Sequence, residues 1–270
     1  MINHSLIKQY KGFTLVEMAI VLVILGFVLS ALLLPLQAQR QQLAQAQTEN
    51  TLENAKRALL GFAQQQGRLP CPATAASNGI ENQNPVGSGI CTQQVGFLPA
   101  ATLGVQPTDA RGYSVDAWNN RVRYAVSQSV VDATTGAATA NYTFTTSSGM
   151  SDVGIANLGS IPSLRVCRSA SAFTTTCSAP PIANELNYLI NNAVAVIYST
   201  GVTGGQGSVG RTDETENLNP SLAILPNQID TVFVSHDISL AAAPNEFDHI
   251  VTWISPFVLY NAMIQAGQLH

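Results

Sequence analysis

The sequence predicts an α+β protein in which one long N-terminal helix precedes a domain of short strands. Two observations predict the helix: residues 13–34 are apolar with a single charge, and residues 37–66 are rich in the helix formers Gln, Ala, Leu and Glu. A third observation predicts the strands. Beyond residue 67, short apolar runs alternate with clusters of Ser, Thr, Gly and Asn, which are typical of turns between strands.

The beginning of the chain combines a basic leader with an apolar run. Lys8 and Lys11 lie in the leader, and the 22 residues of 13–34 carry Glu17 as their one charge. A helix needs about 20 apolar residues to cross a bilayer, so this run predicts a transmembrane helix. The two lysines assign the leader to the cytoplasmic side. A carboxylate inside such a span is costly, which makes Glu17 a functional candidate.

Two other interpretations of this N-terminus fit less well. A secretory signal peptide has an apolar stretch of roughly 7–15 residues, followed by a cleavage site of small residues. Residues 36–38, Leu-Gln-Ala, could serve as such a site. A plain signal anchor gives Glu17 no purpose. The length of the apolar run and its acidic residue argue against both interpretations.

The helix is expected to continue past the apolar run and to end at Gln66. From Leu52 onward, apolar residues recur every three or four positions, which predicts a face that packs on a domain. Gly67 and Pro70 follow as helix-stop signals. Pro35 removes one helical hydrogen bond, so it marks either a tolerated kink or a site where the helix bends when subunits stack.

The rest of the chain starts with a turn-rich stretch to residue 107 and then alternates strands with turns. The most apolar segment, 193–199, is expected to be central in its sheet. A short helix is predicted at 184–190. A C-terminal helix is predicted from Pro256, with Ser255 as N-cap and Gly267 as the stop. The predicted strands are 121–127, 142–146, 164–168, 193–199, 231–235 and 249–254.

Composition and motifs exclude several classes of function. The chain has 270 residues, a net charge of −4 and only 10% charged residues. A nucleic-acid interface needs clustered Lys and Arg, so no nucleic-acid partner is expected. The hydrolase motif Gly-x-Ser-x-Gly is absent and no Ser, His and Asp suggest a triad, so the chain is expected not to be an enzyme. The neighbours Asp248 and His249 are expected to be exposed or to cap a strand.

Four cysteines, Cys71, Cys91, Cys167 and Cys177, point to disulfides, because an even number in an exported domain implies pairing. Three connectivities are possible. The sequential pairs Cys71–Cys91 and Cys167–Cys177 are favoured, since each closes a local, turn-rich loop. Zinc binding by cysteines is disfavoured, because there is no Cys-x-x-Cys and the four histidines show no ligand spacing.

One acidic segment offers hard oxygen donors within seven residues. Calcium takes six to eight oxygen ligands, so a calcium-binding loop is one interpretation. The spacing differs from an EF-hand, and a solvated acidic loop is favoured. No other cofactor is expected. The candidate ligands are Asp213, Glu214, Glu216, Asn217 and Asn219.

The segment Gly12-Phe13-Thr14-Leu15-Val16-Glu17, between the leader and the apolar run, resembles the class III signal peptide of type IV pilins and type II secretion pseudopilins. The resemblance implies that a prepilin peptidase cleaves between Gly12 and Phe13 and methylates the new amine of Phe13. It also implies that Glu17 neutralises the N-terminal amine of a neighbouring subunit during assembly.

The resemblance also implies a pilin-like fold, in which the long helix packs its second half on an antiparallel sheet. Asp116, Trp118 and Tyr124 look like part of the Asp-Pro-Trp-Gly-x-Pro-Tyr-x-Tyr stretch of major pseudopilins, although Ala117 and Asn119 replace its first proline and its glycine. Some major pseudopilins hold calcium in a late loop. The expected regions are the leader 1–12, a transmembrane or filament-core helix 13–34, an amphipathic half 35–66 and a periplasmic or extracellular α+β domain 67–270.

On this interpretation the chain is a structural subunit of a type IV pilus or a type II secretion filament. Its large globular part favours a minor pilin or pseudopilin. The implied partners are the prepilin peptidase and methyltransferase, other pilin or pseudopilin subunits, an inner-membrane assembly platform and lipid. The expected location is the bacterial inner membrane, with the globular domain in the periplasm, and then a filament. The alternative is an adhesin or binding protein, displayed on a filament or anchored in the membrane.

Overall fold

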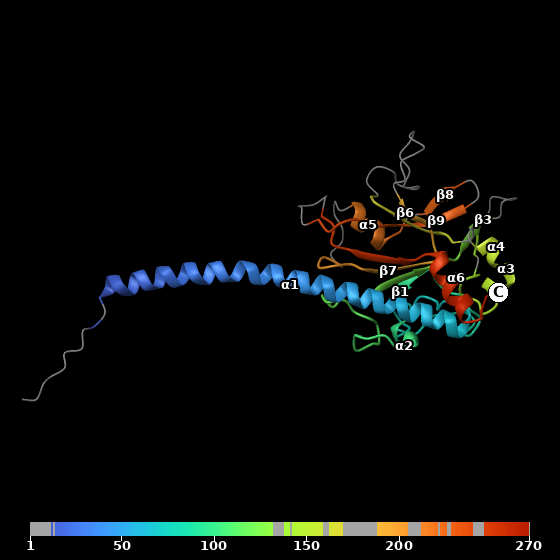
Figure 1. Cartoon of the computed structure of the whole chain (residues 1–270), viewed down its shortest axis with the longest axis horizontal. Helices are drawn as coiled ribbons and strands as arrows, with labels where there is room; N and C mark the ends of the chain where they lie inside the picture. The colour runs from blue at the N-terminus through green and yellow to red at the C-terminus, as the bar shows by residue number, and fades with distance from the viewer. Residues whose placement is uncertain are drawn as a thin grey trace, which may run out of the picture. The chain divides into compact units, whose positions relative to one another are not determined.

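Figure 1 shows the computed structural model of the chain. The structure describes residues 12, 14–131, 138–140, 142–158, 162–169, 188–204, 212–220, 222–225, 228–239 and 246–269. The chain divides into two compact units, Met1–Gln45 and Ala46–His270. The division falls inside the first helix.

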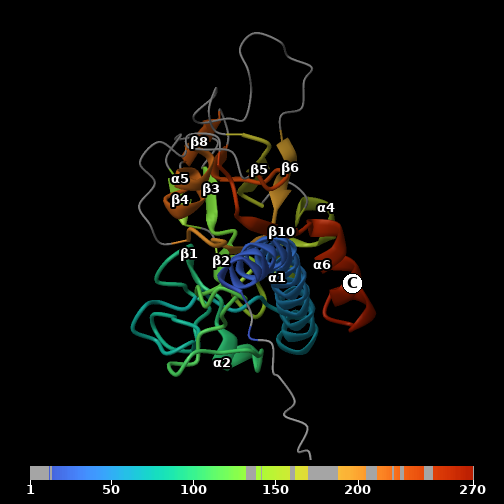
Figure 2. The same ribbon diagram turned by 90° about the vertical axis from the view of Figure 1, so that its left-hand side faces the viewer.

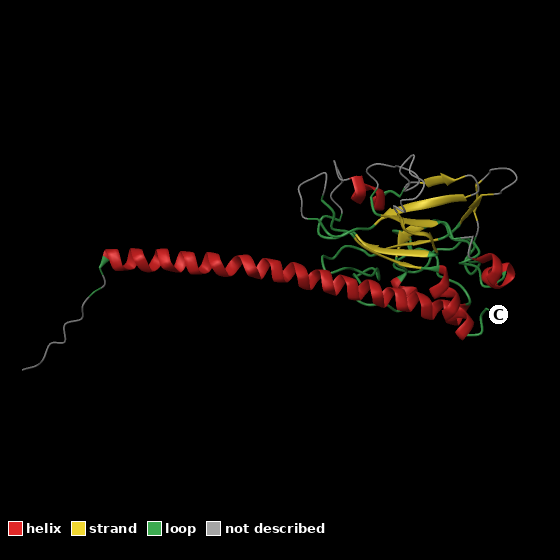
Figure 3. Cartoon of the chain, turned by 45° about the horizontal axis from the view of Figure 1, so that its top comes forward, coloured by secondary structure: helices red, strands yellow, loops and turns green. Residues whose placement is uncertain are grey.

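Helix α1 spans Leu15–Gln66 without interruption, so its assignment continues through position 35 (Figure 3). It ends where the sequence predicts. Gly67 adopts a left-handed conformation with φ of 70°, and its N–H donates to the carbonyl oxygen of Ala63 at 2.9 Å. A side chain with a Cβ is strained in this conformation, which is why glycine suits the helix stop.

The last part of α1 packs on the first sheet of the Ala46–His270 unit (Figures 1 and 2). Leu52, Ala55, Leu59 and Ala63 are buried in the largest core cluster. Their spacing of three and four residues puts them on one side of the helix, so the predicted amphipathic face is confirmed.

The first sheet is antiparallel throughout, with strand order β1-β2-β7-β10. Its central strand β7 pairs on both sides, since Ile197 lies opposite Tyr124 on one neighbour and Thr252 on the other. All residues of β7 are buried, which confirms that the most apolar segment is central. The strands are β1 (Val95–Phe97), β2 (Arg123–Val126), β7 (Ala195–Ser199) and β10 (Ile250–Ile254).

A second sheet, of order β6-β5-β9-β8, covers the other face of the first. Leu164, Val166 and Phe233 from this sheet pack against Val196 and Tyr198 from β7. Strands β5 and β9 run parallel, whereas the other two pairs are antiparallel. The strands are β5 (Leu164–Cys167), β6 (Tyr188–Ala193), β8 (Leu222–Leu225) and β9 (Gln228–Val234); a separate pair joins β3 (Ser129–Val131) and β4 (Ala138–Ala140).

Short helices complete the unit. Helix α6 begins as predicted, because the Ser255 side chain accepts a hydrogen bond from the N–H of Val258 at 3.4 Å and Pro256 is its first residue. Leu259, Tyr260 and Met263 from α6 join the same core cluster as α1. The helices are α2 (Ala100–Leu103), α3 (Gly149–Val153), α4 (Ile155–Leu158), α5 (Thr212–Leu218) and α6 (Pro256–Gln265).

Two predicted elements differ from the structure. The predicted strand at 142–146 forms a turn instead, because the Tyr142 carbonyl accepts hydrogen bonds from the N–H groups of Thr145 and Thr146 at 3.0 and 2.9 Å. Of the predicted helix at 184–190, residues 184–187 lie outside the described residues and the remainder begins strand β6, so the helix is wrong where it is tested. Antiparallel pairing with β5 makes this segment a strand.

Candidate functional site

The N-terminal site lies at the start of α1. Gly12 and Thr14 both precede the helix, and Phe13 lies outside the described residues. Gly12 is exposed, and a Cβ added to it would meet no atom within 4 Å. The described residues on either side of Phe13 are therefore outside the regular helix.

Thr14 and Glu17 cap the helix reciprocally. Glu17 Oε2 accepts hydrogen bonds from the N–H of Thr14 at 2.8 Å and from its hydroxyl at 2.9 Å. The N–H of Glu17 donates to Thr14 Oγ1 at 3.3 Å. This is a capping box, with threonine at the N-cap and glutamate three residues later. Sequence reasoning missed this second role of Glu17, although the Thr-x-x-Glu spacing is a signal for it.

Glu17 is surrounded by an exposed apolar surface on the same helix. It is the one charged residue between Leu15 and Ser30. Monomeric soluble proteins rarely expose a continuous apolar area of this extent, so the surface indicates contact with lipid or with other protein chains. The exposed large apolar residues are Leu15, Val16, Met18, Ile20, Val21, Leu22, Val23, Ile24, Leu25, Phe27, Val28 and Leu29.

In the part of the chain that the structure describes, no helix combines the length and the hydropathy that a membrane crossing requires. The transmembrane helix expected at 13–34 stays a prediction.

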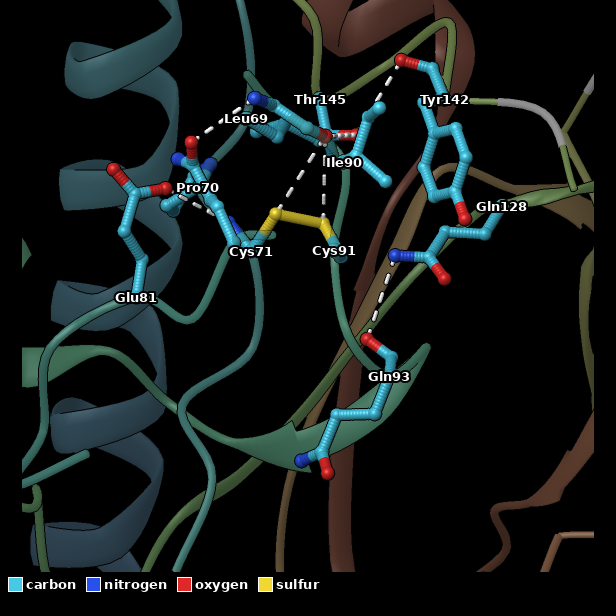
Figure 4. Close-up of a disulfide and its surroundings, with 12 residues drawn as sticks. Leu69, Pro70, Cys71, Glu81, Ile90, Cys91, Gln93, Gln128, Tyr142 and Thr145 are labelled. Atoms are coloured by element: carbon cyan, nitrogen blue, oxygen red, sulfur yellow. Dashed lines mark hydrogen bonds between the residues drawn. A yellow bond between two sulfur atoms is a disulfide. The ribbon is translucent and has the colours of Figure 1, made fainter. Parts of the chain in front are cut away.

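A disulfide joins Cys71 and Cys91, as expected from the sequence, with their Cα atoms 5.2 Å apart (Figure 4). Both cysteines are buried. The carbonyl oxygen of Gly89 lies 3.7 and 3.8 Å from their sulfur atoms and accepts a hydrogen bond from the Thr145 hydroxyl at 2.6 Å. Cys167 is also disulfide-bonded. Its predicted partner, Cys177, lies outside the described residues.

An ion pair supports this disulfide. Arg68 donates two hydrogen bonds of 2.8 Å to the Glu81 carboxylate, and the N–H of Cys71 donates to Glu81 Oε2 at 3.1 Å. Burial raises the pKa of Glu81, but the hydrogen bonds from Arg68, Gln83 and Cys71 and the charge of Arg68 outweigh burial and hold the pKa below its usual value. Glu81 thus connects the exit of α1 to the disulfide loop.

The turn before β2 depends on Asp116. Its Oδ1 accepts hydrogen bonds from the N–H groups of Trp118 and Asn120 at 2.9 and 2.8 Å, and its Oδ2 accepts one from the hydroxyl of Ser199. Asn119 has φ of 68°, a left-handed conformation that asparagine tolerates better than most residues. Asparagine therefore suits this position of the turn.

The five predicted calcium ligands are not gathered in one loop, because most of them lie on helix α5. Asp213 accepts a hydrogen bond from Ser169 and pairs with His236. Asn217 is buried, with its amide hydrogen-bonded to both backbone groups of Val234. Glu216 is partly exposed and Asn219 is exposed.

Glu214 is buried beside Asp248 and His249. Of the two expectations for that pair, exposure is wrong, whereas its position at the start of a strand agrees with the structure, because β10 begins at Ile250. Only 6% of the surface of Asp248 and 2% of that of His249 is accessible. The N–H of Asp248 donates to Glu214 Oε1 at 3.1 Å, and Thr203 donates to Asp248 Oδ2 from its N–H at 2.7 Å and its hydroxyl at 2.8 Å. These contacts come from distant parts of the chain, so local sequence carries no signal for them.

Comparison with protein families finds a match at residues 7–33 to the family described as the prokaryotic N-terminal methylation motif. Comparison with curated proteins finds no match, and comparison with solved structures finds none. The match includes the leader lysines, Gly12, Phe13 and Glu17. The chain therefore carries the class III signal peptide and N-terminal methylation motif typical of type IV pilins and pseudopilins.

Proposed function

We propose that this chain is the precursor of a minor pilin or pseudopilin, which is cleaved between Gly12 and Phe13, methylated on Phe13 and assembled through its N-terminal helix. The filament is a type IV pilus or a type II secretion filament. One observation supports this most directly: within the methylation motif, α1 exposes a long apolar surface that bears a single carboxylate at the capped start of the helix.

The apolar surface explains how such a subunit moves from membrane to filament. In the membrane it is covered by acyl chains, and in a filament by the same surface of neighbouring subunits. Helices gain no hydrophobic advantage by associating in lipid, so packing and polar pairing must supply the preference. The single carboxylate of Glu17 supplies the polar pairing.

The geometry of the cap leaves Glu17 available for this pairing. In the described structure, every hydrogen bond to the Glu17 carboxylate uses Oε2. Oε1 is therefore open to an ammonium group, such as the freed N-terminus of a neighbouring subunit. A charge-assisted hydrogen bond is stronger than a neutral one, and more so where water is excluded.

The proposed partners follow from this route. The prepilin peptidase and methyltransferase acts on Gly12 and Phe13, and an inner-membrane platform passes the mature chain to other subunits. The precursor spans the inner membrane once, with the Ala46–His270 unit on the periplasmic side.

Two substitutions at Glu17 separate charge pairing from capping. Glu17→Gln keeps a side chain that also serves in a capping box but removes the charge, whereas Glu17→Ala removes both. We expect both variants to be cleaved and both to be about tenfold or more depleted from sheared filaments, since loss of about 1.4 kcal/mol changes an equilibrium tenfold. Mass spectrometry of the membrane fraction checks cleavage and methylation, and immunoblots compare filament with membrane.

Glu53→Gln is the matched control, because Glu53 is an exposed acid on the same helix. It should assemble normally. If Glu17→Gln enters filaments like the wild type, the amine-pairing role is wrong. If the mature chain of the wild type still carries residues 1–12, the proposed function as a whole fails.

A further inference from the structure

The Ala46–His270 unit contains a buried group of metal-ligating side chains. Glu214 from α5 meets Asp248 and His249, which immediately precede β10, and one donor atom from each lies within 4.8 Å of the other two. Accessible surface is 2% for Glu214, 6% for Asp248 and 2% for His249. Such a group needs an explanation, because buried carboxylates are costly unless a cation or hydrogen bonds compensate them.

Asp248 is compensated on one side only. Its Oδ2 accepts both hydrogen bonds from Thr203, whereas its buried Oδ1 has no hydrogen-bond partner among the described residues. No described Lys or Arg forms an ion pair with it. Gly201, at φ of 63°, lies so close to Oδ1 that a Cβ there would overlap it. The fold thus makes room for a buried carboxylate oxygen and leaves it unpaired.

We propose that Glu214, Asp248 and His249 bind a zinc ion, with Asp248 contributing Oδ1. Zinc accepts both carboxylate oxygen and imidazole nitrogen, usually from three or four ligands. Calcium instead takes six to eight oxygen ligands and has little use for an imidazole. Zinc bonds of about 2.1 Å bring donors to about 3.4 Å apart in a tetrahedral site, so the three side chains close together on loading.

Asn217 makes the loading measurable. Its amide accepts from the N–H of Val234 at 2.7 Å and donates to the Val234 carbonyl at 2.9 Å, so its NH₂ group is the one that faces His249 Nδ1 at 3.2 Å. A neutral imidazole that binds zinc through Nε2 carries its proton on Nδ1. That proton cannot point at an NH₂ group. We assign the zinc bond to Nε2, so loading is expected to move the Asn217 amide away from Val234, and the Val234 amide should then exchange faster with solvent.

The test uses the full chain in detergent micelles, stripped with EDTA and then given zinc alone or calcium alone. We expect one zinc per chain by elemental analysis after gel filtration. At free zinc about 100-fold above Kd, we expect Tm to rise by about 5 °C or more. Calcium should give no comparable rise. Hydrogen exchange should show faster exchange at Val234 in the zinc-loaded chain.

Variants assign the ligands. Asp248→Asn and His249→Gln should each lose the bound zinc and the zinc-dependent rise in Tm. Asp213→Asn is the control, because it removes a carboxylate charge from α5, the helix that carries Glu214, at a residue that pairs with His236 instead, so it should keep both. A Tm measured in EDTA shows whether each variant folds, and if Asp248→Asn does not fold, His249→Gln decides.

The proposal is overturned if the wild type retains no zinc, or if the folded Asp248→Asn binds as much as the wild type. It is also overturned if His249→Gln keeps the full rise in Tm, or if calcium produces an equal rise. None of these results bears on cleavage or filament assembly.

Discussion

Helix α1 has two regions of opposite character. Between Leu15 and Leu43 the large apolar side chains that the structure describes are exposed, whereas from Leu52 onward they are buried or partly buried against the first sheet. Two leucines on this helix show the contrast, because Leu43 is 70% exposed and Leu59 is 0% exposed. Both regions are helical, so secondary structure does not account for the difference. The second region finds its apolar partner within the chain, and the first exposes a surface for other molecules.

The start of α1 and the Ala46–His270 unit also differ in what surrounds their carboxylates. Glu17 lies on an exposed surface and is engaged by a neighbour three residues away. Glu81 and Asp248 are buried in the Ala46–His270 unit and depend on residues distant in sequence. The contacts of Glu17 can thus be understood from local sequence, whereas those of Glu81 and Asp248 cannot.

The largest expected effect tests the first region alone. If the proposed prepilin peptidase cuts after Gly12, Gly12→Val should abolish cleavage, because it puts a branched side chain at the cut. Intact mass should then retain the first 12 residues. The space around Gly12 is open, so the substitution leaves the fold unchanged. Gly26→Ala, also in open space, should be cleaved normally. Normal cleavage of Gly12→Val would contradict the assignment of the site.

The second test compares the two leucines. Leu59→Ala should lower the free energy of unfolding by about 2–5 kcal/mol, because it leaves a cavity in the core. Leu43→Ala should change it by less than about 0.5 kcal/mol. Chemical denaturation of the full chain in micelles measures both. Equal losses would show that the first region also depends on contacts within its own chain.

The smallest expected change in stability follows from the ion pair of Glu81, and it depends on pH. Its pKa lies below the ordinary value of 4.5, so its ion pair stabilises the fold above that pH and is lost as pH falls through the lowered pKa. Glu81→Gln should lower the free energy of unfolding by about 2 kcal/mol at pH 7, as expected for the loss of hydrogen bonds to a charged group. The difference from wild type should shrink below pH 4.5.

Denaturation at several pH values checks this, with the exposed Glu49→Gln as control. A difference that stays constant from pH 7 to low pH would mean that the packing of Glu81, rather than its charge, is what matters.

Much of the architecture was predictable because its signals are local. Helix α1 follows from its composition and its end from the stop residue Gly67, and Ser255 and Pro256 mark the start of α6. The central strand β7 was recognisable because it is apolar on both faces. The turn at 142–146 was missed, since its residues favour strand and only their hydrogen bonds to Tyr142 and Gly89 show otherwise.

The sequence by itself determined the processing motif, the exposed apolar helix and the single carboxylate at its start, because these depend on residues within a few turns of one another. The tertiary structure alone decided that β5 and β9 run parallel and that Glu214, Asp248 and His249 meet in the interior. Those arrangements join segments separated by tens of residues. Their stability comes from burial and pairing across the fold, which no local pattern of residues encodes.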